Sequence, residues 1–444
     1  MATTVAIAVS TASSRTVINA GATLAVTEPN WPFVTTPELL LNNGTTYING
    51  KFDRQVLTAD LHIFSEYLAL ATISHALDGW RFLSKSIYAI LNGARKQAIH
   101  LAYYAELRAA MSILAESGIG INNYKNFSIN NQNQVSWFPG RTHVATWEAL
   151  ATWSTKRDVA EKVLDSINVM DLSGSEWADA CGVSAKNKPL IITDWMQNWS
   201  IDLKRLKDDS DIRNIASYQV HLNSDTHEPL KQSEFNFIKI LVSSWSDGGS
   251  GFLDWIDLVL IAHLCQTVSI YLYGDAAPLS INKIYISIND YLLKRGLDQN
   301  TACEMIWRIE EVRINDGAEM LSETRITNTS AISVIGRAFL LLRLSGALNR
   351  KQWEEIRRLS PGNTDRWQNT LLNMYARNSN LIEIGTHLTD FSVLFADQND
   401  SNEDFDVLIK DVVGFEPKYI WDECSEPLTS LCRFERLGIL VVNQ

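Results

Sequence analysis

Two segments of the chain combine residue types that act on phosphodiester bonds. In the first, Arg95 stands five positions before His100, and in the second, Arg213 and Asn214 precede Tyr218. Arginine binds a phosphate through forked N–H donors, and a histidine with a pKa near neutrality moves a proton to or from the attacking or leaving oxygen. A tyrosine phenol has an ordinary pKa of about 10, so it is a poor base at neutral pH. The second segment therefore has the arginine without the base.

The first pair has a geometric difficulty. Arg95 and His100 fall on one predicted helix, where five positions correspond to roughly 140° of rotation, so the two side chains leave different faces. They can still line one cleft if the helix begins there or if a second subunit contributes. The other interpretation is structural, with Arg95 in solvent and His100 hydrogen-bonded beside Tyr103 or Tyr104.

The remaining histidines do not form a metal-binding pattern. His143, His221 and His227 are candidates for an RNA or nucleotide pocket, but no two of them have metal-ligand spacing with a third ligand in view. The glycine-rich stretch at 248–251 lacks the Lys-Ser/Thr that follows a phosphate-binding P-loop. We therefore predict neither a metal nor another cofactor.

The elements that must position these residues are predicted to be helices, so the expected fold class is mainly α. Only 10 prolines interrupt the sequence, and 46% hydrophobic with 20% charged residues is typical of a folded chain. Small residues recur at steps of three and four in residues 94–116, the clearest helix. Ser173 and Glu176 have the spacing of a capping box, whereas the Asn- and Gln-rich residues 122–134 predict a long loop.

The length of 444 residues predicts more than one domain, because single cores stop growing at roughly 250–300 residues. Residues 1–58 are rich in Thr, Val and Ala and hold three prolines between 29 and 37, so we expect an irregular or weakly β lead-in. A helical bundle is expected over residues 59–225. A C-terminal, mainly helical domain is expected over residues 232–444.

Residues from about 60 to 225 resemble a HEPN domain, a small helical bundle of nucleotide and RNA metabolism. Residues 95–110, with the sequence Ala-Tyr-Tyr-Ala at their centre, look like the small-residue helix of that family. His143 lies where such families often place a histidine that opens the next helix. Residues 211–218 resemble the closing helix with its arginine and polar residue, except that Tyr218 stands at the position of the family's histidine.

The resemblance implies a component of a prokaryotic conflict system, in anti-phage defence or a toxin module, that forms a homo-oligomer and binds or cleaves RNA. In RNase members an arginine and a histidine at a dimer cleft cut RNA without metal. An alternative is a non-enzymatic scaffold or sensor subunit that binds a partner protein. The site residues that the resemblance implies are Arg213, Tyr218, Arg95 and His100 for catalysis, and Asn214 and His143 for ligand binding.

Charge limits the way in which this chain can contact RNA. The formal net charge is −12, with an isoelectric point near 5.2. A surface of this sign repels nucleic acid phosphates, so an RNA contact requires a local basic patch. The five cysteines are odd in number and scattered, so we expect reduced thiols.

Neither a membrane span nor a secretory signal is predicted. Residues 252–273 are the most apolar stretch, but Asp254, Asp257 and His263 within them would be costly in lipid, so a buried helix is expected. The first basic residue is Arg15, after the apolar residues 1–10, whereas a signal peptide begins with positive charge. These features predict a cytoplasmic protein.

Overall fold

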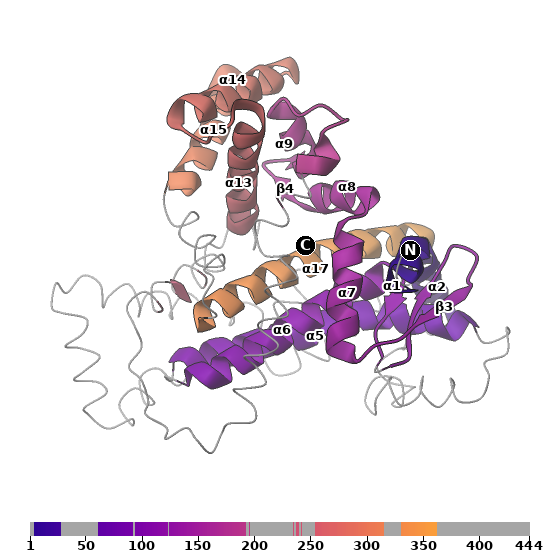
Figure 1. Ribbon diagram of the computed structural model, residues 1–444. Coiled ribbons are helices and arrows are strands. Elements are labelled where there is room, and N and C mark those ends of the chain that lie inside the picture. The colour runs from indigo at the N-terminus through magenta and orange to yellow at the C-terminus, as the bar shows by residue number, and fades with distance from the viewer. Residues whose placement is uncertain are drawn as a thin grey trace, which may run out of the picture.

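The computed structural model describes residues 4–27, 61–91, 94–122, 124–191, 254–314 and 330–361, together with Trp195, Glu234, Phe237, Ile238 and Leu241. Helices dominate these residues, and the strands among them are short, so the predicted mainly α fold class is confirmed (Figure 1). The candidate domain boundary near residues 223–231 lies outside the described part of the chain.

The centre of the molecule is a pair of long helices, α5 (Leu61–Leu91) and α6 (Arg95–Glu116), which pack side by side (Figure 1). The small residues of α6 are fully buried, so the backbones of neighbouring helices approach closely, as the sequence predicts. These residues are Ala98, Ala102, Ala105 and Ala109.

A third long helix, α17 (Ala331–Leu359), packs against both α5 and α6. Its polar residues contact the same two helices. Arg337 donates from Nε to Oε1 of Glu106 over 3.1 Å, and Ser345 Oγ lies 2.7 Å from Ser112 Oγ. The sequence assigns this helix to a separate C-terminal domain, but α17 instead shares the core of the first bundle. A hydrophobic pattern identifies a buried face without identifying its neighbours, which explains the error.

Two helices begin the described chain, α1 (Thr4–Thr11) and α2 (Ser14–Thr27). The prediction of an irregular or weakly β lead-in is therefore wrong for residues 4–27. The three prolines on which it relied all follow Thr27, and the β-branched residues Val9 and Val17 are fully buried, so tertiary packing outweighs their low helix propensity.

A small antiparallel sheet follows α6, formed by β1 (Ile119–Gly120), β2 (Asn126–Ile129) and β3 (Val135–Phe138) in that order. Most of residues 122–134, predicted as a long loop, is thus strand β2 and a tight turn. Asn130 closes the turn, because its Oδ1 accepts from the backbone N–H groups of Gln132 and Gln134.

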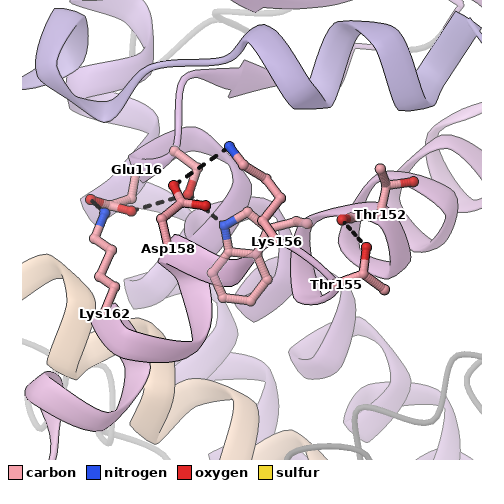
Figure 2. Close-up of polar contacts among 8 residues, drawn as sticks. Glu116, Thr152, Thr155, Lys156, Asp158 and Lys162 are labelled. Atoms are coloured by element: carbon pink, nitrogen blue, oxygen red, sulfur yellow. Dashed lines mark hydrogen bonds and ion pairs between the residues drawn. The ribbon is translucent and has the colours of Figure 1, made fainter. Parts of the chain in front are cut away.

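The end of α6 is fixed to the next two helices, α7 (Thr142–Ser154) and α8 (Arg157–Ser166). Glu116, which is buried, forms an ion pair with Lys162 of α8 and accepts from Ser117 Oγ over 3.2 Å (Figure 2). Trp153 of α7 donates from Nε1 to the same Ser117 hydroxyl over 2.7 Å. This network joins three helices at one point.

A two-stranded sheet of β4 (Asn168–Val169) and β5 (Leu172–Ser173) leads into α9 (Gly174–Ala180). The predicted capping box is confirmed, since the Ser173 side chain accepts from the Glu176 backbone N–H and Glu176 accepts from the Ser173 backbone N–H.

A second group of helices stands beside α9 and comprises α13 (Asp254–Tyr273), α14 (Pro278–Lys294) and α15 (Gln299–Ile314) (Figure 1). An ion pair joins this group to α17, because Arg343 donates from Nε to Oδ1 of Asp257 over 2.9 Å and its Nη2 contacts Oδ2. Both side chains are almost completely buried. The two groups of helices are therefore connected through a paired charge.

Two helices are long and apolar enough to cross a membrane, by length and composition alone. They are α17 and the Trp255–Tyr273 part of α13. The apolar window of α17 is completely buried in the protein and that of α13 is 67% buried, as in the core helices of a folded domain. The expectation that residues 252–273 form a buried helix is confirmed for most of α13.

Candidate functional site

An aromatic cluster lies where the first half of α6 meets the start of α7. His100 and Tyr104, one helical turn apart on α6, have ring centroids 5.0 Å apart, and Tyr104 lies 6.2 Å from His143 of α7. Tyr103 lies 5.6 Å from His143 and 6.3 Å from Trp147. We use the name aromatic cluster for these five residues. The structure thus brings together His100 and His143, two residues that sequence analysis selects separately.

The hydrogen bonds of this cluster orient His143. The buried Tyr103 hydroxyl lies 2.8 Å from His143 Nδ1, and Trp147 Nε1 lies 3.4 Å from the same hydroxyl. Indole nitrogen only donates, so the tyrosine oxygen accepts from Trp147 and its own proton is available for Nδ1. In that assignment the ring proton of His143 sits on Nε2, the nitrogen that does not face Tyr103.

Arg95 is engaged by a carboxylate. It donates to Glu234 through two parallel bonds, from Nε to Oε1 over 2.7 Å and from Nη2 to Oε2 over 2.5 Å, and only 16% and 8% of the two side chains are exposed. A two-bond contact of this kind is the geometry with which arginine also binds phosphate. Glu234 therefore occupies one edge of the guanidinium and neutralises its charge.

The structure describes the residues of one of the two predicted catalytic pairs, Arg95 and His100. The His100 ring lies beside Tyr104, the neighbour that the structural interpretation expects. Arg95 is largely buried against Glu234, so the expectation of a solvated arginine is wrong. Arg213, Asn214 and Tyr218 lie outside the described residues.

The structure shows an arginine–histidine contact that sequence analysis missed. Arg108 of α6 lies with Nη1 3.1 Å from Nδ1 of His75 on α5, and with Nε 3.7 Å from Oδ2 of Asp78. We call these three residues the His75 site. It is partly open to solvent, because 32% of the Arg108 side chain and 49% of the Asp78 side chain are exposed.

The environment sets the protonation states at the His75 site. Burial, and secondarily the positive charge of Arg108, holds the pKa of His75 well below its ordinary value. Because arginine only donates, Nδ1 of His75 must accept, which also requires the neutral ring. Burial raises the pKa of Asp78 against the opposing effects of Arg108 and Arg81. A neutral imidazole nitrogen can accept a proton and a guanidinium can bind a phosphate, and metal-independent RNA cleavage uses both roles.

The sequence carries only a weak signal for the His75 site. His75 and Asp78 are three positions apart, so they share a face of the predicted helix. Arg108 is 33 positions from His75, and nothing in the sequence shows that α5 and α6 align with these residues in contact. The contact depends on the register between two helices, which tertiary packing determines.

The described residues also bear on metal and thiol chemistry. They contain no group of three or more His, Cys, Asp or Glu side chains that could hold a metal ion. Cys181 and Cys265 are free and buried with their sulfur atoms 3.7 Å apart, and Cys303 is free and exposed. The proximity of Cys265 and burial raise the pKa of the Cys181 thiol, which keeps it unreactive.

The second group of helices carries eight large apolar residues that are exposed. They lie at the end of α13, along α14 and on α15, three helices that pack on one another. The residues are Ile270, Tyr271, Leu272, Tyr273, Leu279, Ile286, Leu293 and Trp307. We call these eight residues the apolar face; large exposed apolar patches are typical of protein-binding surfaces.

Comparison with models of protein families, with curated proteins and with solved structures finds no match in any of the three.

Proposed function

We propose that this protein is a non-enzymatic scaffold or sensor subunit that binds a partner protein in a multi-component prokaryotic conflict system of the cytoplasm. The observation that carries the proposal is the apolar face. Leu279, Ile286 and Trp307 expose 72%, 63% and 60% of their surface, although each is large enough to be stabilised by burial. A partner protein that covered these side chains would remove their apolar surface from water.

The state of Arg95 supports this choice over an RNA-cleaving activity. A phosphate that approached its Nε–Nη2 edge would have to displace Glu234 from two charge-assisted hydrogen bonds. The displaced carboxylate would be left near the phosphate, and the two anions would repel each other. The net charge of −12 acts in the same direction.

The place in a defence or toxin system follows from the resemblance of residues 60–225 to HEPN domains. That resemblance is a prediction from sequence, and the long α5–α6 pair with its buried alanines is compatible with it. Cytoplasmic residence and a homo-oligomeric state belong to the same proposal.

A second candidate function is metal-independent RNA cleavage, and the His75 site is the observation that favours it. Arg108 and a neutral His75 lie within hydrogen-bonding distance and are partly open to solvent. Arg108 would turn from Nδ1 of His75 to bind the phosphate, and the freed Nδ1 would accept the proton of the 2′-hydroxyl. Asp78 weighs against this function, because an ionised carboxylate beside Arg108 lowers the affinity for phosphate.

The experiment that separates these functions combines partner binding and RNA cleavage. The chain is co-expressed with the product of each neighbouring gene, as wild type and as the apolar-face variant Trp307→Glu. Light scattering then measures the molar mass of each complex. A stoichiometric complex that Trp307→Glu abolishes supports the scaffold function. Ile7→Glu is the matched control, because Ile7 is similarly exposed, at 57%, on helix α1.

The same preparations are incubated with total RNA and tRNA. Wild-type cleavage that is lost in His75→Ala and Arg108→Ala but kept in Arg308→Ala would support the enzyme, since Arg308 of α15 is more than half exposed and pairs with Glu304. Variants Arg213→Ala and His100→Ala test the two pairs chosen from sequence. Absence of any complex, with cleavage dependent on one of these residues, would overturn the scaffold function.

A further inference from the structure

The exposed face of α14 carries one large apolar residue every seven positions. Leu279, Ile286 and Leu293 are 72%, 63% and 37% exposed. Seven positions fall about 20° short of two full turns, so the three side chains form a nearly straight line about 21 Å long. The opposite face of the helix is buried in the protein through Ile281, Ile284, Ile288 and Leu292. We call the exposed line the α14 stripe.

Polar residues flank this stripe symmetrically. Lys283 and Asp290 lie three positions before and four positions after Ile286, both within about 60° of the stripe on one side. Asn282 and Asn289 take the corresponding places on the other side. The centre of the pattern is therefore Ile286. Along one edge of the stripe, the positive charge of Lys283 precedes it and the negative charge of Asp290 follows it.

This pattern is complementary to itself when reversed. A two-fold axis at Ile286, perpendicular to the plane of two paired helices, sets Leu279 of each copy against Leu293 of the other. The same axis places Lys283 of each copy beside Asp290 of the other, offset by about one residue, or about 1.5 Å. Parallel pairing instead places both charges against the asparagine side of the second copy, where neither meets an opposite charge.

The two ends of α14 fit the reversed arrangement as well. Asp275 is exposed just before the helix begins, and Lys294 is exposed at its last position, so antiparallel copies bring them together. Antiparallel helix dipoles also attract. Lys283 is already held at the edge of the stripe, because its Nζ lies 4.7 Å from the centre of the Tyr273 ring.

We propose that the α14 stripe binds a second copy of this chain, as an antiparallel helix pair about a two-fold axis at Ile286. The inference rests on the proposed function, since it assigns one part of the apolar face to self-association. The end of α13 and Trp307 of α15 then remain for a different partner. The interface lies outside residues 60–225, the part of the chain that resembles a HEPN domain.

The test measures the mass of the purified full-length chain by sedimentation over a wide concentration range. The wild type is expected to be a dimer, and Ile286→Glu is expected to weaken it by about 100-fold or more, because the variant places two like charges on the axis. Lys283→Glu and Asp290→Lys are each expected to weaken it by about 10-fold. The double variant restores opposite charges across the axis, so its dimer should return to within a few-fold of the wild type. Ile7→Glu, on α1, is the control.

Each outcome is decisive, provided that circular dichroism shows every variant to be folded. A dimer lost in Ile286→Glu and regained in the double charge exchange supports the antiparallel pair. A monomeric wild type, or a dimer that Ile286→Glu leaves unchanged, overturns the inference. The proposed function fails separately, because it depends on a complex with a neighbouring gene product and on Trp307. A monomer that still forms that complex overturns the self-association, and with it the homo-oligomeric state, but leaves the partner-binding function standing.

Discussion

Helices α17 and α14 differ in how their surfaces are covered. Residues 331–349 of α17 are buried throughout, although they include two arginines, two serines and an asparagine. The helix α14 buries one face and exposes Leu279, Ile286 and Leu293 on the other. The first helix is enclosed by its own chain, whereas the second is only half covered.

The polar residues of α17 explain how a buried helix can carry charge. Arg337 pairs with Glu106, Arg343 pairs with Asp257, and Asn349 donates from Nδ2 to the carbonyl oxygen of Thr72 over 3.3 Å. Each bond is specific to one register between α17 and a neighbour. Contacts within the chain therefore fix the position of α17. The exposed apolar residues of α14, by contrast, are available to another molecule.

The largest effect in this comparison is expected from breaking a buried ion pair. Replacement Arg343→Ala leaves the carboxylate of Asp257 buried without its cation, and such losses cost about 3–5 kcal/mol of unfolding free energy. Urea denaturation measures this change. Arg308→Ala is the control, because Arg308 and Glu304 are paired but more than half exposed; its expected cost is below about 1 kcal/mol.

A double replacement makes the same test sharper. Arg343→Met with Asp257→Leu removes both charges and fills a similar volume, so most of the lost stability should return. If the double variant is as unstable as the single one, the pair contributes through its bonds rather than by cancelling a buried charge. If Arg343→Ala costs no more than Arg308→Ala, α17 is not enclosed as described.

A smaller effect is expected when one apolar side chain is shortened on each helix. Leu340 of α17 is fully buried, so Leu340→Ala should cost about 2–5 kcal/mol. Leu279 of α14 is 72% exposed, and Leu279→Ala should change the stability of the isolated chain by no more than about 0.5 kcal/mol. Thermal unfolding at low protein concentration measures both, because dilution removes any contribution from a second copy.

The dependence of the melting temperature on protein concentration provides a second comparison of Leu279→Ala and Leu340→Ala. If a second copy covers α14, Leu279→Ala should reduce the rise of melting temperature with concentration, and Leu340→Ala should leave that rise unchanged. Equal losses of stability in the two dilute variants would contradict the difference in burial on which the comparison depends.

Local sequence patterns predict several of these elements correctly. The alanines of α6 recur at helical spacing and are all buried, and Ser173 with Glu176 forms the predicted capping box. These features depend on residues within one or two turns of each other. Ser330 caps α17 in a similar way, since its side chain accepts from the Ser333 backbone N–H. Secondary structure with strong local signals is therefore accessible from sequence.

Contacts that join distant parts of the chain, in the candidate site and in the core, could not be predicted from local patterns. Arg95 and its partner Glu234 are 139 positions apart, and Arg337 and Glu106 are 231 positions apart. An arginine selected for phosphate chemistry and one selected for a buried ion pair look the same in sequence. Helices α1 and α2 were missed for a related reason, since burial against distant helices outweighs their β-branched composition.

The smallest effect concerns Arg108, a partly exposed arginine of the α5–α6 pair, in contrast to the buried arginines of α17. Its neighbour His75 has a pKa held below the ordinary value near 6.5, so the unfolded chain binds a proton more readily than the folded chain. Unfolding free energy must then fall as pH falls through 6.5. For one proton the slope is at most about 1.4 kcal/mol per pH unit.

Urea denaturation at pH 7.5, 6.5 and 5.5 measures this slope in the wild type and in His75→Gln. The variant removes the titrating ring and keeps an oxygen that can accept from Arg108, so its loss of stability on acidification should be smaller.

The variant Asp78→Asn should instead lose more stability on acidification than the wild type. Burial raises the pKa of Asp78, and the proton that the folded chain then gains partly offsets the effect of His75 at acidic pH. Identical slopes in the wild type and His75→Gln would show that the pKa of His75 is not lowered in the folded protein. The His75 site would then lose its claim to hold a neutral base beside a guanidinium, which is the basis of the second candidate function.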